Sequence, residues 1–179
     1  VASALMSRDS RGARDRRRGR SSRIKRLRFF ALIQLCQEIN VSDDLGLEVD
    51  LERGCFRDAR GRRVLLRGAN VGGRAKRAPF LPLELEHPFD IVDVSERARA
   101  LLAHLPRWGF DTVRLTFSWE GVEPARGVYD EGYLAHLGAM LDVALEHRLR
   151  VVLDFHQDIF ATALGGDGMP LWALPPAYR

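Results

Sequence analysis

Two stretches of the chain carry a short apolar run that ends in polar side chains. Residues 151–155 are apolar apart from one aspartate, and His156 and Asp158 lie just after them. Residues 112–117 repeat the pattern, with Arg114 inside the run. A short apolar run bounded by polar residues predicts a strand that is buried on both faces. Polar groups where such a strand ends are typical of the mouth of an α/β sheet or barrel.

The segments before each of these strands have the apolar spacing of amphipathic helices. We expect the first helix to be capped by Ser95 and to end or kink at Pro106. Its predicted apolar stripe comprises Ala98, Leu101, Leu102 and Leu105. We expect the second helix to run from about Glu131 to His147. Its predicted stripe comprises Leu134, Leu137, Leu141, Ala144 and Leu145.

The preceding segment predicts a hairpin that leads into a first buried strand. Alternating apolar residues begin near Leu47, residues 58–61 are a turn signal, and Val64–Asn70 form the expected strand. Residues 74–93 hold three prolines and are expected to form a long loop, and residues 120–130 a second loop. Strands alternating with helices predict a parallel α/β fold with right-handed crossovers.

Charge is concentrated at the start of the chain. Residues 1–28 carry a net charge of +9, and since the whole chain is +4, the remainder sums to −5. We therefore expect residues 1–44 to be a disordered Arg-rich tail and residues 45–179 to be the folded domain. A solvated extension is the main interpretation of the tail. A signal peptide and a phosphate-binding arm remain alternatives, although the apolar run is short and no aromatic residues interleave with the arginines.

The sequence carries no pattern typical of a metal site or a membrane span. The cysteines Cys36 and Cys55 do not have metal-ligand spacing, and both a disulfide and two reduced thiols remain open. Four further histidines are scattered along the chain: His87, His104, His136 and His147. No apolar run approaches the roughly 18 residues of a transmembrane helix. We expect no cofactor, and localisation stays open.

Three motifs resemble the start of a glycoside hydrolase family 5 enzyme, most of all the endoglycoceramidase-related group. They are RGANVGG, the run WGFDTVRLTFSWEGVEP, and VVLDFHQD followed by GGDGMPLWA, and the resemblance as a whole covers about residues 47–175. The resemblance implies the N-terminal portion of a (β/α)8 TIM barrel, about three βα units. It also implies retaining hydrolysis of β-glycosidic bonds, in this group between a sugar chain and ceramide.

The chain departs from the family at the catalytic residues. Retaining hydrolysis needs two carboxyl groups about 5 Å apart. In the family the acid/base glutamate follows an asparagine after the fourth strand, and the nucleophile follows the seventh strand. This sequence has no Asn-Glu dipeptide. We therefore expect both glutamates to lie beyond the chain end, and the chain alone to be inactive and marginally stable or prone to aggregate.

Five residues resemble parts of the family's sugar pocket. Arg114 resembles the arginine that holds the nucleophile ionised, with an internal ion pair as the alternative. His156 and Asp158 resemble residues that bind hydroxyls of the sugar next to the broken bond. Lys76 resembles a lysine that reaches the same sugar, with a solvated loop lysine as the alternative. Trp172 is expected either to stack on a sugar ring or to cover the barrel rim.

Three other carboxylates near these positions are expected to have no catalytic role. Asp154 is interpreted as a structural residue that is hydrogen-bonded within the barrel. Glu120 and Glu123 are interpreted as solvated or capping residues of a loop beside Trp119.

Three hypotheses about function remain. The first, which we favour, is a glycosidase fragment that acts on a glycolipid or related β-glucoside, with membrane contact only through its substrate. The second is a glycan- or glycolipid-binding remnant without activity. The third is an Arg-rich nucleic-acid-binding protein, which we do not expect. The choice among glycosphingolipid, steryl glucoside and β-glucan stays open.

Overall fold

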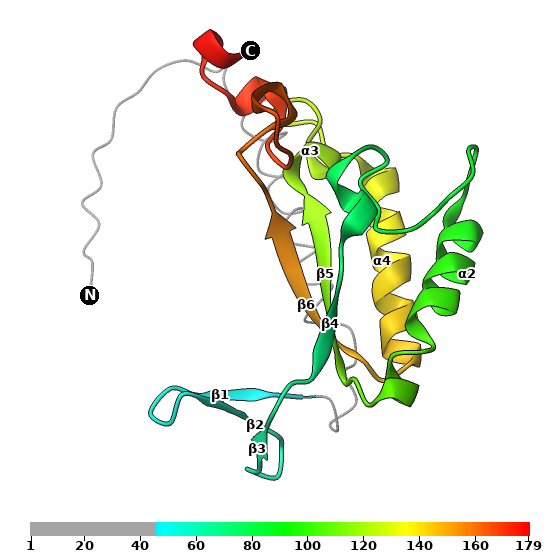
Figure 1. Ribbon diagram of the computed structural model, residues 1–179, viewed down its shortest axis with the longest axis vertical. Coiled ribbons are helices and arrows are strands. Elements are labelled where there is room, and N and C mark those ends of the chain that lie inside the picture. Colours follow the sequence, from blue (N-terminus) through cyan, green and yellow to red (C-terminus); the bar gives the residue numbers. More distant parts are fainter. Residues whose placement is uncertain (1–45) are drawn as a thin grey trace, which may run out of the picture. The chain divides into compact units, whose positions relative to one another are not determined.

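The computed structural model describes residues 46–179, which form two small sheets and two long helices (Figure 1). The predicted tail of residues 1–44 and Cys36 lie outside the described residues. Cys55 carries a free thiol. The two sheets follow one another along the chain, the first made of β1 to β3 and the second of β4 to β6.

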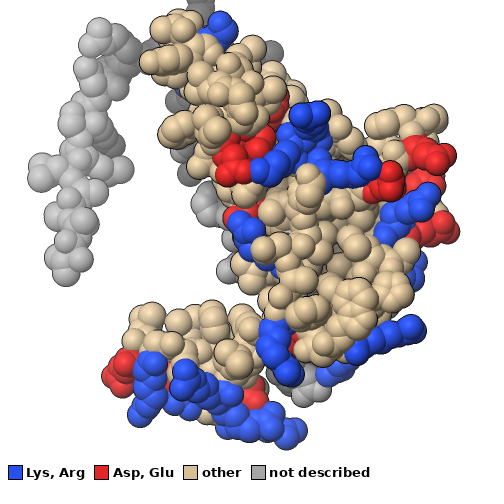
Figure 2. All heavy atoms as spheres, in the orientation of Figure 1, with Lys and Arg blue, Asp and Glu red and all other residues tan. Residues whose placement is uncertain are grey.

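The first sheet is the predicted hairpin extended by a third short strand. It contains β1 (Glu48–Asp50), β2 (Cys55–Arg57) and β3 (Arg63–Val64), all antiparallel, in that order. The turn at residues 58–61 is confirmed, because Asp58 accepts hydrogen bonds from the backbone of Arg60 and Arg62 at 3.0 and 2.8 Å. Basic side chains line much of this hairpin (Figure 2).

The second sheet is parallel, as the sequence predicts. It consists of β4 (Gly68–Val71), β5 (Thr112–Ser118) and β6 (Arg150–His156), in that order. The single strand expected over residues 64–70 is wrong, because Val64 belongs to β3 and the second sheet starts only at Gly68. Arg67 lies between β3 and β4, and its backbone N–H donates a hydrogen bond to Asp111 Oδ1 at 2.9 Å.

The two long strands differ in burial, which corrects the prediction for residues 151–155. β5 is buried along nearly its whole length. β6 is not, since Val152 is 45% exposed and Phe155 is 48% exposed. In the described part of the chain β6 pairs only with β5, so its other edge has no neighbouring strand. The apolar pattern therefore suits a central strand, whereas the structure gives β6 an edge position.

Helices α2 (Ile91–Leu102) and α4 (Glu131–Glu146) pack together on one face of the parallel sheet (Figure 1). The predicted second helix is confirmed to within one residue. The expected stripe is wrong at Leu134 and Leu145, which are only partly buried, whereas Tyr133, Met140 and Val143 are buried. In α2 the expected stripe is wrong at Leu101, which is 41% exposed, while Val94 is fully buried. No helix among residues 46–179 has the length and apolar character needed to cross a bilayer.

Helix α2 starts earlier than the sequence predicts, and Ser95 is not its cap. Asp90 is the cap, because its Oδ1 accepts hydrogen bonds from the backbone N–H of Val92 and Asp93 at 2.7 and 3.1 Å. The Asp93 carboxylate accepts from the Asp90 N–H in return, which completes a capping box. Ser95 lies inside the first turns and donates its hydroxyl to the Ile91 carbonyl. The pair Asp90 and Asp93 therefore marks the start of α2 better than Ser95 does.

The connecting segments hold short helical turns. These are η1 (Gly73–Lys76), η2 (Pro106–Trp108), α3 (Trp119–Val122), η3 (Thr162–Leu164), η4 (Leu171–Ala173) and η5 (Pro176–Tyr178). The segment expected to be a long loop, residues 74–93, is anchored by the fully buried Leu81 and by Leu83. Because η1 follows β4 directly, it places Lys76 beside the carboxyl end of the parallel sheet (Figure 1).

The cap of α2 can be tested by comparing two substitutions. We expect Asp90→Ala to lower the free energy of unfolding by about 1 kcal/mol, the usual contribution of an N-cap. Ser95→Ala should change it by less than about half of that, because helix interiors favour alanine. Urea denaturation followed by circular dichroism measures both. Equal losses in the two variants would contradict the assignment of Asp90 as the cap.

Candidate functional site

Arg114 lies at the centre of a group of polar side chains on the parallel sheet. In the strand register Arg114 is paired with Asn70 of β4 on one side and with Val152 of β6 on the other. Asp154 lies two residues beyond Val152 in β6. The Arg114 guanidinium donates to Asp154 Oδ2 at 2.7 Å and to Asn70 Oδ1 at 3.4 Å. The internal ion pair that the sequence left as an alternative is thus present. Because the Arg114 side chain is 40% exposed, the ion pair leaves part of the guanidinium accessible.

Asp154 links this arginine to His156. His156 Nδ1 lies 2.9 Å from the same Asp154 Oδ2 that accepts from Arg114. The expectation that Asp154 is hydrogen-bonded is confirmed, and its carboxylate is the shared acceptor between two predicted site residues. An aspartate that accepts from one imidazole nitrogen fixes the orientation of the ring. His156 therefore presents its other nitrogen, Nε2, toward Asp158, whose Oδ2 is 3.5 Å away.

Asp158 and Lys76 come from segments 82 residues apart and form an ion pair. The ammonium of Lys76 also lies 3.4 Å from Asp167 Oδ2. The hydrogen bond from Lys76 holds the pKa of the Asp158 carboxyl below its usual range. In turn, the hydrogen bond to Asp158 raises the pKa of Lys76. Lys76 is therefore held in an ion pair and is not a freely solvated loop lysine.

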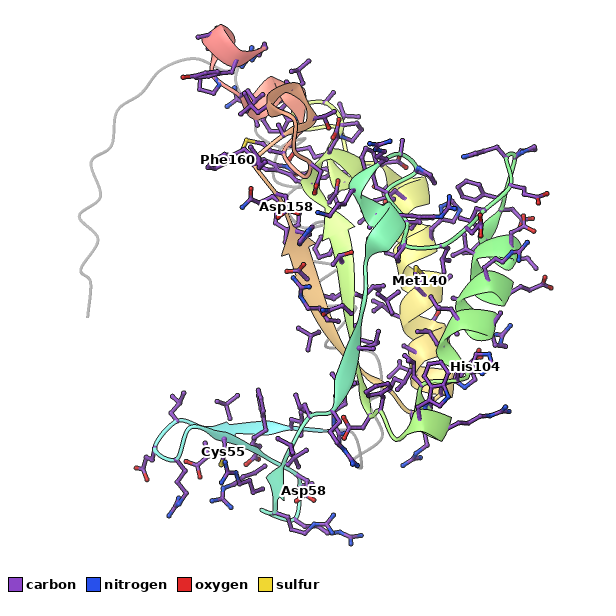
Figure 3. All side chains as sticks on the ribbon, viewed as in Figure 1. Cys55, Asp58, His104, Met140, Asp158 and Phe160 are labelled. Carbon is purple, nitrogen blue, oxygen red and sulfur yellow. The ribbon has the colours of Figure 1, made fainter. Side chains whose placement is uncertain are left out.

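These contacts join side chains from four segments into one continuous set, which we call the polar network. Its members are Asn70, Arg114, Asp154, His156, Asp158, Lys76 and Asp167. Acidic and basic side chains lie next to one another near the carboxyl ends of the strands (Figure 2), and Asp158 lies just past the end of β6 (Figure 3). Four of the five residues that the sequence singled out thus lie together.

Asp167 is the member of the network that the sequence analysis missed. Only 6% of the residue is exposed, and its backbone forms an antiparallel bridge with Asp158. The signal that could have revealed it is the GGDG run, in which an aspartate is flanked by glycines. Glycines at such positions allow one backbone to approach another closely.

A cleft of about 820 Å³ opens beside the Lys76 end of the network. It is lined by Lys76, Arg77, Ala78, Phe80, Glu120, Asp158, Ile159, Thr162, Gly165, Gly166 and Asp167. The lining combines charged hydrogen-bonding groups with a few apolar side chains. Such a cleft suits a small polar ligand that offers several hydroxyl groups.

Glu120 differs from its expected solvated or capping role. Its Oε2 atom is buried and has no hydrogen-bond partner within residues 46–179. Burial raises the pKa of the Glu120 carboxyl, and a hydrogen bond with Thr162 offsets part of this effect. The sequence could not show this, because the residues that cover Glu120 lie about 40 positions further along the chain.

Glu123, expected to be solvated or capping, lies at the C-cap of α3, and its carboxylate is hydrogen-bonded within the loop and not solvated. Its carboxylate accepts hydrogen bonds from Trp119 Nε1 at 2.8 Å and from the Gly127 backbone N–H at 2.6 Å. Its carbonyl accepts from Trp172 Nε1 at 2.9 Å. Glu123 thus ties both tryptophans to the same loop.

Trp172 lies apart from the polar network. Its ring meets Trp119 edge-on with centroids 5.4 Å apart, and Arg126 lies over it at 6.0 Å. Within residues 46–179 no hydrogen bond or ring contact joins it to the network. Of the two expected roles, covering the rim matches these contacts, and stacking on a sugar stays a prediction.

Three of the four histidines outside the network have aromatic neighbours. His87 and His136 both contact Phe89, and His104 stacks on Trp108 with centroids 5.8 Å apart. In the part of the chain that the structure describes, no three His, Cys, Asp or Glu residues are placed to hold a metal ion.

The sequence was compared with models of known protein families. The model of the cellulase family, glycosyl hydrolase family 5, matches residues 76–176, more than half of the chain. The chain belongs to glycosyl hydrolase family 5. The matched region contains most of the polar network, the cleft and the helix α4, so the family assignment and the site coincide.

Two relatives indicate the branch of family 5 that the chain resembles. A glucosylceramidase of Cryptococcus neoformans is 35% identical over 153 residues, covering 74% of this chain and 20% of that protein. Endoglycoceramidase I of Rhodococcus hoagii is 42% identical over 123 residues, covering 68% of this chain and 22% of that protein. The chain therefore spans about a fifth of the length of these relatives.

A solved structure gives the same result for the fold. The crystal structure of sterylglucosidase 1 from Cryptococcus neoformans matches with a TM-score of 0.54 and 32% identity, covering 66% of this chain and 18% of that one. Family 5 proteins are (β/α)8 barrels, and this chain matches part of one.

The burial of Glu120 leads to a pH-dependent prediction. A raised pKa means that folded protein binds this proton more tightly than unfolded protein, so stability falls as pH rises through that pKa. Glu120→Gln removes the titration. We therefore expect its gain in melting temperature over the unsubstituted chain to be larger at pH 7 than at pH 4.

The matched control is Glu84→Gln, which removes an exposed carboxylate that pairs with Arg74. Differential scanning calorimetry at both pH values measures the two differences. A difference for Glu120→Gln that is the same at pH 4 and pH 7 would contradict the assignment.

Proposed function

We propose that residues 46–179 form about three βα units of a family 5 glycosidase barrel and bind the sugar of a β-linked glycolipid. The observation that carries the proposal is the contact between His156, Asp158 and Lys76 at the carboxyl end of a parallel sheet. In α/β barrels this is the end at which substrates bind. Membership of a glycosyl hydrolase family supports a sugar as the ligand.

The network has the chemistry that sugar hydroxyls require. A hydroxyl both donates and accepts, so it suits a site in which a carboxylate and an ammonium lie side by side. Asp158 and Lys76 are such a pair, and both side chains are about half exposed. Hydrogen bonds to charged groups contribute more than neutral ones. These two residues are therefore the best placed to hold hydroxyls of the bound sugar.

We also propose that the two catalytic carboxyl groups come from outside residues 46–179. Each aspartate of the network already has a charged partner: Asp154 with Arg114, and both Asp158 and Asp167 with Lys76. None of them forms the free pair about 5 Å apart that retaining hydrolysis uses. In this proposal the accessible part of Arg114 faces the nucleophile and keeps it ionised, because a nearby cation lowers a carboxyl pKa.

The lipid part of the proposed substrate is supported by apolar side chains that follow the network. Ile159, Phe160 and Leu164 are 66%, 57% and 38% exposed. Phe160 lies near Asp158, beyond the end of β6 (Figure 3). Exposed apolar side chains beside a polar site suit a ligand with a sugar head and a lipid tail. The names of both relatives, a glucosylceramidase and an endoglycoceramidase, agree with such a ligand.

A chimera tests the proposal directly. Residues 46–179 replace the corresponding segment of the Rhodococcus endoglycoceramidase I, and release of the sugar from a glycosphingolipid is measured. We expect the chimera to hydrolyse the substrate and the 179-residue chain alone to release none. A well-folded chimera that binds the glycolipid without cleaving it would favour the non-catalytic alternative.

Asp158→Asn in the active chimera tests the sugar contact. We expect kcat/KM to fall about tenfold to a hundredfold, since a hydrogen bond to a charged group contributes about 1.5–3 kcal/mol. Glu84→Gln, at an exposed residue away from the network, should leave kcat/KM unchanged. Equal activity of the two variants would remove Asp158 from the site.

The apolar side chains can be tested separately from the sugar contacts. We expect the double variant Ile159→Ser and Phe160→Ser to raise KM for a glycosphingolipid in mixed micelles. KM for a soluble aryl β-glucoside should not change, because that substrate has no lipid chain. A parallel increase for both substrates would contradict lipid contact at these residues.

A further inference from the structure

Lys76 is held by two carboxylates that differ in their access to solvent. Its ammonium pairs with Asp158, whose side chain is 52% exposed, and with Asp167, whose side chain is 8% exposed. Both aspartates line the cleft, but a ligand there meets much more of the Asp158 side chain than of the Asp167 side chain. A buried aspartate is rare unless it is paired, and Lys76 is the partner that the structure gives to the Asp167 side chain.

The backbone places Asp167 beside Asp158 with little freedom. The Asp167 N–H donates to the Asp158 carbonyl at 2.8 Å, and the Asp158 N–H donates to the Asp167 carbonyl at 3.2 Å. A Cβ atom at Gly166 would lie 1.9 Å from the Asp158 carbonyl oxygen, and one at Gly168 would lie 2.5 Å from that of His156. Only glycines allow this approach, so the backbones of the two aspartates lie in close contact.

The two carboxylates have different roles in this geometry: Asp158 contacts the ligand, and Asp167 contacts the Lys76 ammonium. When a sugar hydroxyl binds Asp158, it competes with Lys76 for the same carboxylate oxygens. Without a second anchor the long lysine side chain would then be free to leave, since it has about 2 kcal/mol of rotamer entropy to regain. Asp167 remains in contact with the ammonium from a position that the ligand does not occupy.

We propose that Asp167 is a positioning residue that holds the Lys76 ammonium in the site while Asp158 exchanges partners with the ligand. The charged or titratable groups around Lys76 are Asp158 and Asp167 in direct contact, His156 beyond Asp158, and Arg77 and Glu120 in the wall of the same cleft. The sugar as ligand rests on the proposed function. The hold of Asp167 on Lys76 is a property of this chain alone and is tested without any ligand.

The sequence offers a direct measurement, because Lys25 and Lys76 are its only two lysines. In protein labelled with 13C-lysine, each side chain gives its own signal, and its shift during a pH titration reports the pKa. We expect the pKa of Lys76 to lie above that of Lys25 in the full chain. In Asp167→Asn the pKa of Lys76 should fall toward that of Lys25, although Asp158 is still present.

A second variant tests the role of the backbone. Gly166→Ala keeps both carboxylates but pushes the backbone of Asp167 away from Asp158, and we expect the Lys76 pKa to fall here also. The matched control is Gly138→Ala, where an added Cβ meets no atom within 4 Å and Lys76 should not respond. If Asp167 did not contact the Lys76 ammonium in solution, the Lys76 pKa would be unchanged in folded Asp167→Asn protein.

Three results would overturn the proposal: a Lys76 pKa that is unchanged in folded Asp167→Asn, one that equals that of Lys25 in the unsubstituted chain, or loss of the fold in Asp167→Asn. The last would assign Asp167 to folding alone. In the active chimera Asp167→Asn should lower kcat/KM about tenfold, with Asp167→Glu less affected. An inactive chimera with the expected Lys76 titration would count against the proposed function only.

Discussion

The parallel register of β4, β5 and β6 is the constraint on which the site depends. It places Asn70, Arg114 and Asp154 beside one another although more than 80 residues separate the first from the last. A slip of one residue between β5 and β6 would turn Asp154 to the opposite face of the sheet and break its contact with Arg114. The buried apolar side chains of β5, among them Val113 and Leu115, oppose such a slip because each would leave the core.

Each carboxylate of the network contacts at least one basic side chain, either a cation or the His156 ring. Arg114 meets Asp154, which meets His156, then Asp158 and Lys76, and the set ends at Asp167. Partly buried charges in such a series depend on one another, because removing one leaves its neighbour without compensation. The network is therefore best understood as one unit, in which accessible members face a ligand and buried members keep them in place.

The sequence predicted the elements well where periodicity is strong and local. The extent of α4 and the parallel strands followed from apolar runs and helical periodicity, whereas the grouping of Arg114, His156 and Asp158 in one site followed from the resemblance to family 5. The start of α2 was wrong because several residues near position 91 can cap a helix, and only the hydrogen bonds choose Asp90. The exposure of Val152 was missed because apolar composition does not reveal whether a strand is central or at an edge.

The residues that sequence reasoning missed are those whose surroundings come from distant segments. The burial of Glu120 depends on residues near Thr162, and the position of Asp167 depends on backbone contact with Asp158. Neither has a periodic signal of its own. In both cases burial of a carboxylate determines the role, and burial is a tertiary property that a single sequence does not contain.

The central claim is that this part of the chain binds the sugar while the reacting carboxylates lie elsewhere in the barrel. Labelling the active chimera with a 2-deoxy-2-fluoro-β-glucoside, which traps the covalent glycosyl-enzyme intermediate, tests it most directly. Peptide mass spectrometry then locates the modified residue. The account predicts a label on a carboxylate from the segment supplied by the Rhodococcus enzyme. A label on Glu120, Asp154, Asp158 or Asp167 would contradict it.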